Sequence, residues 1–326
     1  MIKSYLKKIS FYIDCARPSH WIKNIFMLPG FILALTIENE FTFEIFSLFF
    51  IGFLSTCLLS SANYSLNEIL DRNYDKNHPV KKNGPLAQGY ISHKLVLLQY
   101  IVLVIFGLLL ASTLTPMFFL ISIFFLFMAL VYNVPPVRAK EIPYLDVLVE
   151  AINNPIRLFL GWTSICTIIS PPASLTICYW FGGAFLMAMK RYSEYEMIND
   201  KVVASRYRKS FGFYTAESLL LSSFYYALLS NFFLAVFIIK YHIAFIIVVP
   251  FISFLFVWYL KIAISKKYED SISTDKLYKK YFFLIYCGFI GIICIIIFFI
   301  EIPFLNHLVD HTYLMDKKIK WIDFYE

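Results

Sequence analysis

The sequence predicts an all-α, polytopic membrane protein, on the evidence of its composition, the length of its apolar runs and the placement of its basic residues. Of the 326 residues, 60% are apolar, 16% are charged and 35 are Phe. Soluble domains average about 45–50% apolar and roughly 25% charged residues, so this chain lacks the polar side chains to cover a soluble globule. The net charge of +7 requires no nucleic-acid partner, because basic residues are expected on the cytoplasmic loops of membrane proteins.

Nine apolar runs have about the 20 residues that a helix needs to cross ~30 Å of hydrocarbon. The runs do not alternate polar and apolar residues as the strands of a membrane barrel do. We therefore expect helices, whose backbone hydrogen bonds are satisfied within each segment. The expected spans are 22–40, 43–63, 95–112, 116–133, 144–165, 172–190, 216–239, 242–262 and 281–301.

The basic residues give an orientation. Most of the 29 Lys and Arg residues lie before the first span or in every second connection after it. The positive-inside rule then predicts a plasma (inner) membrane protein with a cytoplasmic N-terminus and an extracytoplasmic C-terminus. Eight or ten spans would break this alternation. We expect a single membrane-embedded domain, 1–326, with a cytoplasmic segment 1–20 and an extracytoplasmic tail 302–326.

Acidic residues recur at the end of the second expected span. Asn67, Asp71 and Asp75 are spaced four residues apart, which places them on neighbouring turns of one helix face. Two carboxylates about 6 Å apart repel each other unless a cation lies between them. Mg²⁺ suits such a pair, because it binds one or two carboxylates together with substrate phosphate oxygens. The alternative is a solvated helix end at which acids happen to recur.

Basic and polar residues follow in two places near the same side. Lys81 and Lys82 lie in a loop rich in Pro and Gly, where they can bind phosphate oxygens. The alternative is that they are ordinary basic residues of a cytoplasmic loop. Asp146 and Arg157, with Glu150 and Asn153 between them, fall within ~60° on one helix face. Such a stripe must face protein or water, for function or for assembly through interhelical hydrogen bonds.

The end of the sixth expected span carries a fourth group of polar and charged residues. Lys190 and Glu194 are spaced for an ion pair on one helix face. The alternative is a charged helix end whose long side chains reach back to the membrane interface.

Together these motifs resemble the UbiA superfamily of intramembrane prenyltransferases. The resemblance covers most of the chain and rests on the nine spans and three motifs: Asn67-x-x-x-Asp71-x-x-x-Asp75, His78-Pro79…Pro85-Leu86-Ala87-x-Gly89, and Tyr132-x-x-Pro135-Pro136-x-Arg138-x-Lys140. It implies a ring of transmembrane helices around a central cavity. Aspartate motifs there hold Mg²⁺ and a diphosphate near the cytoplasmic face.

A second likeness distinguishes branches of the superfamily. Quinone and haem branches carry a second Asp-rich motif after the sixth span, where this chain has Lys190-Arg191-Tyr192-Ser193-Glu194 followed by Arg206-x-Arg208-Lys209. This pattern resembles the polyprenyl-phosphate (decaprenyl-phosphate) phosphoribosyltransferases, which transfer 5-phosphoribose from phosphoribosyl pyrophosphate to a polyprenyl phosphate. Glu68, Gly84 and the Pro135-Pro136 loop depart from that branch.

The resemblance implies roles for the polar residues. Asp71, Asp75 and Asn67 would hold Mg²⁺, and Asp71, Asp75, Asp146, Lys190 and Glu194 would be catalytic. The predicted substrate-binding residues are Asn67, Lys81, Lys82, Arg138, Lys140, Arg157, Arg191, Tyr192 and Arg208.

Two other functions remain open on the sequence. Within the superfamily, a polyprenyl diphosphate would ionise at the same Mg²⁺ site and an aromatic ring such as 4-hydroxybenzoate would trap the allyl cation. A transporter would need polar groups that continue through the bilayer midplane and symmetric broken helices. A homo-oligomer in the lipid bilayer is compatible with either enzyme.

Overall fold

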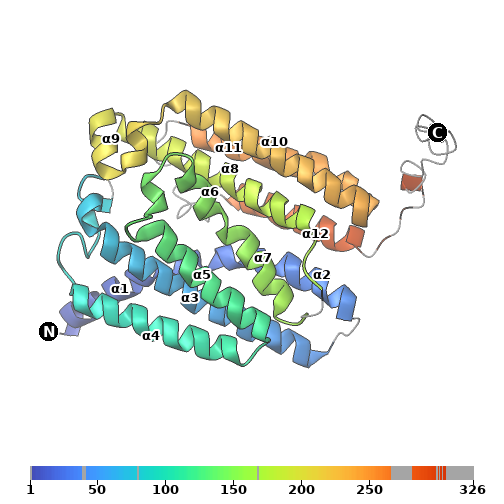
Figure 1. Ribbon diagram of the computed structural model, residues 1–326, viewed down its shortest axis with the longest axis horizontal. Coiled ribbons are helices and arrows are strands. Elements are labelled where there is room, and N and C mark those ends of the chain that lie inside the picture. Colours follow the sequence, from blue (N-terminus) through green and yellow to red (C-terminus); the bar gives the residue numbers. More distant parts are fainter. Residues whose placement is uncertain are drawn as a thin grey trace, which may run out of the picture.

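The computed structural model describes residues 2–38, 42–78, 81–166, 169–265, 281–298, 300, 302 and 304–305, with the backbone alone for 2–7 and 38. This part of the chain is helical, with no strand, which confirms the all-α prediction (Figure 1). Most of the predicted tail 302–326 lies outside the described residues. The elements are α1 (Ile2–Ala16), η1 (Pro18–Met27), α2 (Leu28–Glu38), α3 (Phe43–Asp75), η2 (Lys81–Asn83), α4 (His93–Ser112), α5 (Pro116–Asn133), η3 (Ala139–Glu141), α6 (Leu145–Ala151), α7 (Asn153–Thr163), α8 (Ala173–Ile198), α9 (Lys201–Tyr207), η4 (Lys209–Gly212), α10 (Ala216–Tyr241), η5 (Ile243–Val248), α11 (Val249–Ile264) and α12 (Tyr281–Phe298).

Within the described residues, seven helical segments are long and apolar enough to cross a membrane, so the chain is a multi-pass membrane protein. They match seven of the nine expected spans. The segments are Lys8–Ile37, Phe43–Asp75, His93–Ser112, Pro116–Asn133, Ala216–Tyr241, Ile243–Ile264 and Tyr281–Phe298. The count of nine stays a prediction.

The other two expected spans, 144–165 and 172–190, differ from the prediction, and the first of them contains the buried Asp146 and Arg157. The expected span 144–165 is broken at Ile152 into α6 and α7, and Pro155 in the first turn of α7 has no N–H to continue the hydrogen bonds of α6. The span 172–190 becomes α8, whose last turns are charged. A Cβ on Gly183 of α8 would lie 2.0 Å from Asn154 Nδ2, so the break and α8 are in direct contact.

Helix α3 connects the membrane interior to the charged end of the bundle. Its first turn is capped by Thr42, whose side chain accepts a hydrogen bond from the Ile45 N–H. Its 33 residues make a helix about 50 Å long, well beyond the ~30 Å of hydrocarbon. Asp71 and Asp75 therefore lie on the turns that reach out of the hydrocarbon, at the end of α3 that contacts α9 and the Lys140 of η3. We call this the charged end.

The segment from η1 to α2 packs backbone against backbone on α7. A Cβ on Gly161 would lie 1.8 Å from the Met27 carbonyl oxygen, and one on Gly30 would lie 2.1 Å from the Leu158 carbonyl oxygen. Small residues at such crossings let membrane helices approach closely. This contact fixes the N-terminal segment against the interior face of α7.

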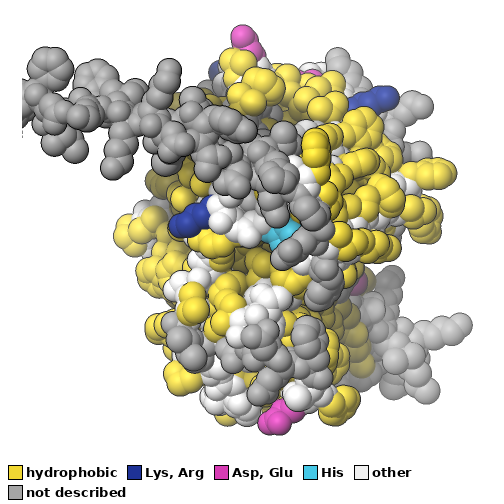
Figure 2. All heavy atoms as spheres, turned by 90° about the vertical axis from the view of Figure 1, so that its right-hand side faces the viewer, with side chains coloured by type: hydrophobic (Ala, Val, Ile, Leu, Met, Phe, Trp, Pro, Cys, Tyr) yellow, Lys and Arg dark blue, Asp and Glu magenta, His cyan; other side chains and the backbone are white. Residues whose placement is uncertain are grey.

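The outer helices face lipid. In α12 the buried residues Phe283, Ile290 and Ile297 recur every seven residues, which makes one apolar stripe toward the bundle, while most of the helix is exposed and apolar. Figure 2 shows the end opposite the charged end, where the visible described side chains are mainly hydrophobic with few charges.

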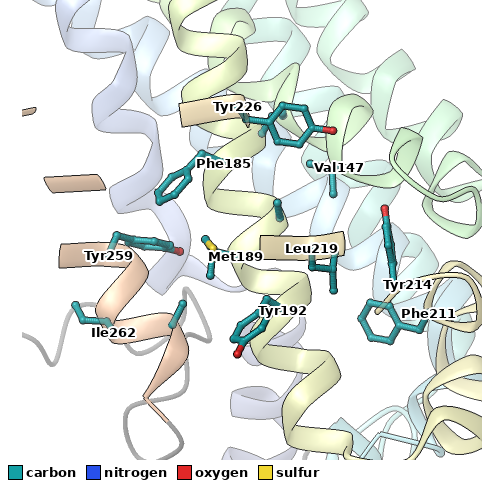
Figure 3. Close-up of a cluster of buried hydrophobic side chains, with 14 of the residues drawn as sticks. Val147, Phe185, Met189, Tyr192, Phe211, Tyr214, Leu219, Tyr226, Tyr259 and Ile262 are labelled. Carbon is teal, nitrogen blue, oxygen red and sulfur yellow. The ribbon is translucent and has the colours of Figure 1, made fainter. Parts of the chain in front are cut away.

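The largest apolar core lies between α6, α8, α10 and α11, and it supports the charged end from one side. Figure 3 shows Phe185 and Met189 of α8 together with Tyr259 of α11 in this cluster. Phe211 of η4 and Tyr214, which follows η4, extend it toward the charged end. Burial of these large side chains holds α8, which carries the predicted cationic motif, in a fixed rotation.

Candidate active site

The acidic pair of α3 is enclosed by the protein. Asp71 and Asp75 are only 8% and 6% exposed, and both lie on the face of α3 that turns into the bundle. Asn67, one turn earlier, is half-buried. The helical spacing of the three residues is therefore as the sequence predicted, and charges near the bilayer are kept inside an enclosed site.

Two cations from the loop after α5 meet Asp71. Lys140 Nζ donates to Asp71 Oδ1 and, over 2.8 Å, to Asn133 Oδ1. Arg138 Nη2 donates to the same carboxylate oxygen over 3.1 Å. Burial lowers the pKa of Lys140 to about 8, although the Asp71 carboxylate acts in the opposite direction. Asp71 is thus neutralised by cations that can also bind phosphate oxygens.

A small cleft opens at this point. Arg138 lines the cleft and has a left-handed backbone conformation, with φ 35°. Its guanidinium lies 4.5 Å from the centre of the Tyr74 ring, and its Nε donates a hydrogen bond to Glu141 over 2.6 Å. Lys209 contacts the other oxygen of Glu141 at 2.9 Å. The cleft is lined by Asp71, Tyr74, Arg138, Lys140, Glu141, Tyr207 and Arg208.

The loop after α3 is held against α9 beside the cleft. Lys81 Nζ donates to the Tyr207 hydroxyl over 2.6 Å and lies 5.1 Å from the centre of that ring. His78 packs against Tyr207 with ring centres 4.6 Å apart, and its Nδ1 accepts the backbone N–H of Lys81 over 3.1 Å. Burial, with the nearby Lys81 charge second, lowers the pKa of His78 to about 4, so this imidazole is neutral.

A second ionic cluster surrounds Arg191, which is 1% exposed. Its Nε donates to Asp146 and its Nη1 to Glu194, each over 3.1 Å. The Asp146 carboxylate is 0% exposed and also accepts the Tyr214 hydroxyl over 2.6 Å and the Ser210 hydroxyl over 3.3 Å. Both carboxylate oxygens of Asp146 therefore accept hydrogen bonds from within the protein, so Asp146 is placed to orient Arg191.

Tyr132 joins this cluster to the cleft. Its hydroxyl accepts hydrogen bonds from Arg191 over 2.7 Å and from Arg208 over 3.0 Å. Arg208 also lies 3.8 Å from Asp146 and lines the cleft, while Glu150 lies 3.7 Å from Arg191. The structure therefore brings guanidinium groups from α8 and the α9–η4 junction to one side of the acidic pair.

The remaining predicted residues lie in different places. Lys190 is half-buried at the same end of α8, and Arg157 is buried deeper, on α7. Lys82 is exposed on the loop surface. Tyr192 packs in the apolar core of Figure 3 rather than in the cleft, so its contact with substrate stays a prediction without support from the described geometry.

Sequence reasoning missed part of the site. Arg17 forms an ion pair with Glu68 and stacks 5.6 Å from the Tyr64 ring, although the sequence analysis counted it only for orientation. Tyr207 and Asn24 were not singled out either. The signal for Arg17 was its place immediately before Pro18, where α1 ends and η1 begins; nothing in spacing alone could pair Tyr207 with Lys81, since they are 126 residues apart.

The acidic pair fits a magnesium ion that shares its ligands with a substrate. Among the described residues, no three His, Cys, Asp or Glu side chains come together as a metal-binding group. Mg²⁺ does not need one, since it is commonly held by one or two carboxylates plus substrate phosphates and water. In the described part of the chain the Asp75 carboxylate makes no side-chain hydrogen bond or ion pair, so its oxygens are available as ligands.

Comparison with known proteins identifies the family of this chain. Residues 24–286 match the model of the UbiA prenyltransferase family. The chain is 28% identical over 208 residues to decaprenyl-phosphate phosphoribosyltransferase of Mycobacterium tuberculosis, covering 64% of this chain and 67% of that protein. It is 26% identical over 194 residues to nodulation protein NoeC of Azorhizobium caulinodans, covering 59% of this chain and 60% of that protein. The matched region therefore spans about two thirds or less of these relatives.

Among solved structures, the fold is similar to that of a UbiA homolog from Archaeoglobus fulgidus bound to DMAPP and Mg²⁺. The TM-score is 0.68 with 21% sequence identity, and the match covers 89% of this chain and 99% of that chain. At this identity the likeness concerns the fold alone. It extends the family match along nearly the whole described bundle.

Proposed function

The chain belongs to the UbiA prenyltransferase family of membrane transferases, and from this premise we propose that it transfers 5-phosphoribose from phosphoribosyl pyrophosphate to a polyprenyl phosphate. The similarity to decaprenyl-phosphate phosphoribosyltransferase supports this assignment over other reactions of the family. In the reaction, an oxygen of the polyprenyl phosphate forms a bond to C1 of the ribose. The bond from C1 to the pyrophosphate oxygen breaks, and pyrophosphate leaves.

One observation carries the proposal: α8 presents cations to the site where the quinone and haem branches carry a second Asp-rich motif. Arg191 is the centre of this cluster, with Asp146 and Glu194 as its partners at 3.1 Å. Both acids are thereby committed to an arginine. A donor with several phosphate groups needs more cations than a single diphosphate does, and a bidentate guanidinium suits phosphate oxygens.

The residues at the cleft would divide the work as follows. Asp71 and Asp75, assisted by Asn67, would hold Mg²⁺, which would supply charge neutralisation for the departing pyrophosphate. Lys140 and Arg138 are placed to bind its oxygens, because both already reach the Asp71 carboxylate.

The surrounding residues would hold these groups in place. Lys81, fixed by Tyr207, would close the loop side of the cleft. Glu194 and Asp146 would orient Arg191, and Lys190 lies half-buried at the same end of α8. The charged end would face the cytoplasm of an inner membrane, where a soluble pyrophosphate donor can enter, while the polyprenyl chain would extend along the apolar bundle.

The paired substrate assay tests this proposal. Membranes that contain the protein receive Mg²⁺ with either labelled phosphoribosyl pyrophosphate and polyprenyl phosphate, or labelled polyprenyl diphosphate and 4-hydroxybenzoate. We expect a labelled lipid phosphoribosyl product from the first pair alone, and its loss in Asp75→Asn. A prenylated aromatic product from the second pair, with none from the first, would assign the chain to prenyl transfer.

Prenyl transfer is the second candidate because of one specific comparison. The Archaeoglobus fulgidus homologs of the same fold are described as bound to DMAPP or GPP with Mg²⁺. A diphosphate with an allylic chain would use the same acidic pair. The cations around Arg191 and Arg208 favour the phosphoribosyl donor over it.

A further inference from the structure

Arg157 is a buried cation far from the acidic pair. It lies on α7, is 6% exposed, and contacts Asn24 of η1, which in turn contacts Ser60 and Cys57 of α3. Ser60 precedes Asp71 by eleven residues on one continuous helix, so this level of α3 lies about 16 Å deeper along its axis. Arg157 therefore belongs to a level of the bundle distinct from the cleft around Asp71.

Among the described residues no carboxylate lies within ion-pair distance of Arg157, and the Glu150 carboxylate acts on its charge only from farther away. Its Nε donates to Asn24 Oδ1 over 2.9 Å and its Nη1 to the Asn153 carbonyl over 3.1 Å, while the guanidinium lies 5.6 Å from the Phe125 ring. In the described part of the chain its Nη2 makes no hydrogen bond and is not sealed from solvent. A cation at membrane depth is costly without an anion, and such residues mark substrate pathways.

Asn24 is built to hold this guanidinium in one orientation. It is 0% exposed, its Oδ1 also accepts the Ser60 hydroxyl over 3.3 Å, and its Nδ2 points to Cys57 Sγ at 3.2 Å. The close contact of Gly161 with the Met27 carbonyl fixes η1 against α7. The neutral amide of Asn24 thus positions Arg157 without cancelling its charge. An aspartate of the same shape would position the arginine and also neutralise it.

We propose that Arg157 and Asn24 form a second anion subsite that binds a phosphate monoester, with Arg157 in contact and Asn24 as the positioning residue. This subsite rests on the proposed function and deepens it. Each substrate of that reaction carries such a group: the donor has a 5-phosphate, and the lipid acceptor has its terminal phosphate. A guanidinium with free N–H groups at this depth suits either one.

The isosteric change Asn24→Asp separates a binding role from a structural one. It places a carboxylate 2.9 Å from Arg157 Nε, which supplies the direct counter-ion that the more distant Glu150 does not provide. If Arg157 serves packing alone, the fold is unchanged or firmer and the substrate constants stay as they are. If Arg157 binds a phosphate monoester, the new carboxylate competes with it, and the KM of one phosphate substrate rises by about tenfold or more.

Two kinetic titrations distinguish the donor 5-phosphate from the phosphate of the lipid acceptor. Purified protein in detergent or nanodiscs is assayed with phosphoribosyl pyrophosphate varied at fixed polyprenyl phosphate, and then the reverse. A rise confined to the lipid substrate assigns the subsite to the acceptor, and a rise confined to the donor assigns it to the 5-phosphate. Asn231→Asp makes the same change at a half-buried position on α10 and should leave both constants within about twofold.

A direct binding experiment tests the subsite without requiring the proposed transfer reaction. Ribose 5-phosphate and farnesyl phosphate are tested for protection against thermal unfolding of the wild type, Asn24→Asp and Arg157→Gln; the last variant serves if Asn24→Asp does not fold. We expect one ligand to protect the wild type and neither variant. Equal protection of folded wild type and variants, or no protection by either ligand, would overturn the subsite. Absence of phosphoribosyl transfer together with this protection would overturn the proposed reaction and leave the subsite standing.

Discussion

Two buried acids of this protein, Asp75 and Asp146, have opposite surroundings. Asp146 is 0% exposed, and its oxygens accept hydrogen bonds from Arg191, Tyr214 and Ser210. Asp75 is 6% exposed and makes no side-chain hydrogen bond or ion pair within the described chain, one turn from Asp71 in the cleft. A carboxylate that the protein satisfies completely supports structure, whereas one that it leaves available supports ligand binding.

The comparison also separates two acids, Asp71 and Asp146, both of which the sequence analysis expected to be catalytic. Asp71 shares one oxygen with Lys140 and Arg138, both of which line the cleft and can turn toward a phosphate. The partners of Asp146 come from α8, η4 and the segment before α10, and one of them, Tyr214, belongs to the apolar core of Figure 3. The cations beside Asp71 can change partners, whereas the Asp146 carboxylate is held in place and serves the site by orienting Arg191 beside Arg208, which lines the cleft.

The largest expected effect is the loss of turnover in Asp75→Asn. The variant keeps shape and removes the charge that would hold Mg²⁺, so we expect the rate of transfer to fall by about a thousandfold or more. Its thermal unfolding in detergent should stay close to wild type, because no internal partner is lost. The exposed Asn73 of the same helix offers a control, Asn73→Ala, which should retain activity. Full turnover in Asp75→Asn would remove the acidic pair from the mechanism.

Asp146→Asn should act on stability instead. It leaves Arg191 buried with fewer anions, which costs about 3 kcal/mol of unfolding free energy. We expect a clear drop in the thermal midpoint of the detergent-solubilised protein. Glu196→Gln, on a half-buried position of the same helix, is the matched control and should change stability little. Wild-type stability with lost turnover in Asp146→Asn would reverse the roles of the two acids.

Removing single tyrosine hydroxyls compares the cluster around Asp146 with the cleft around Asp71. Tyr214→Phe removes the 2.6 Å hydrogen bond to Asp146 and should cost about 1.5 kcal/mol of stability with little change in KM. Tyr207→Phe removes the acceptor of Lys81 and should raise the KM of the donor several-fold with a smaller loss of stability. The measurements are chemical or thermal unfolding and steady-state kinetics of both variants. A raised KM in Tyr214→Phe together with a loss of stability alone in Tyr207→Phe would contradict this division between a structural cluster and a binding cleft.

The smallest effect is a pH dependence from His78. Burial lowers its pKa to about 4, below the ordinary 6.5, so the unfolded chain takes up a proton before the folded one does. Its contribution to stability is present above pH 6.5 and is lost as the pH falls toward 4, by about 1 kcal/mol between pH 7 and pH 5.5. His78→Gln should flatten this part of the stability profile. An unchanged profile in that variant would show that His78 does not titrate there.

Much of this architecture follows from the sequence. Apolar length and basic asymmetry predict the membrane helices, and the spacing of Asn67, Asp71 and Asp75 predicts their common face. Spacing does not reveal which polar groups satisfy each other across the bundle: Asp146 and Tyr214 are 68 residues apart, and Asn24 and Arg157 are 133 apart. Nor does it predict the break of α6 from α7, although Pro155 marks it in retrospect.

The broken helix also shows why the predicted substrate residues divide into groups. Asp146 lies on α6 and Arg157 on α7, and the stripe expected on one straight helix is distributed between the ionic cluster and the deeper level. Tyr192 follows Arg191 directly in the sequence, and the rotation of α8 sends its ring into the apolar core. Tertiary packing decides which of these side chains reach the ionic cluster, the deeper level or the apolar core, and helical periodicity alone does not predict it.

The central claim is that Asp71 and Asp75 hold a pyrophosphate through Mg²⁺. Thermal unfolding of the purified protein with Mg²⁺, pyrophosphate or both tests it most directly. We predict that both together raise the midpoint of the wild type and of Asn73→Ala, that either one alone does little, and that Asp75→Asn loses the effect. Equal protection by pyrophosphate without Mg²⁺, or undiminished protection in Asp75→Asn, would contradict the account.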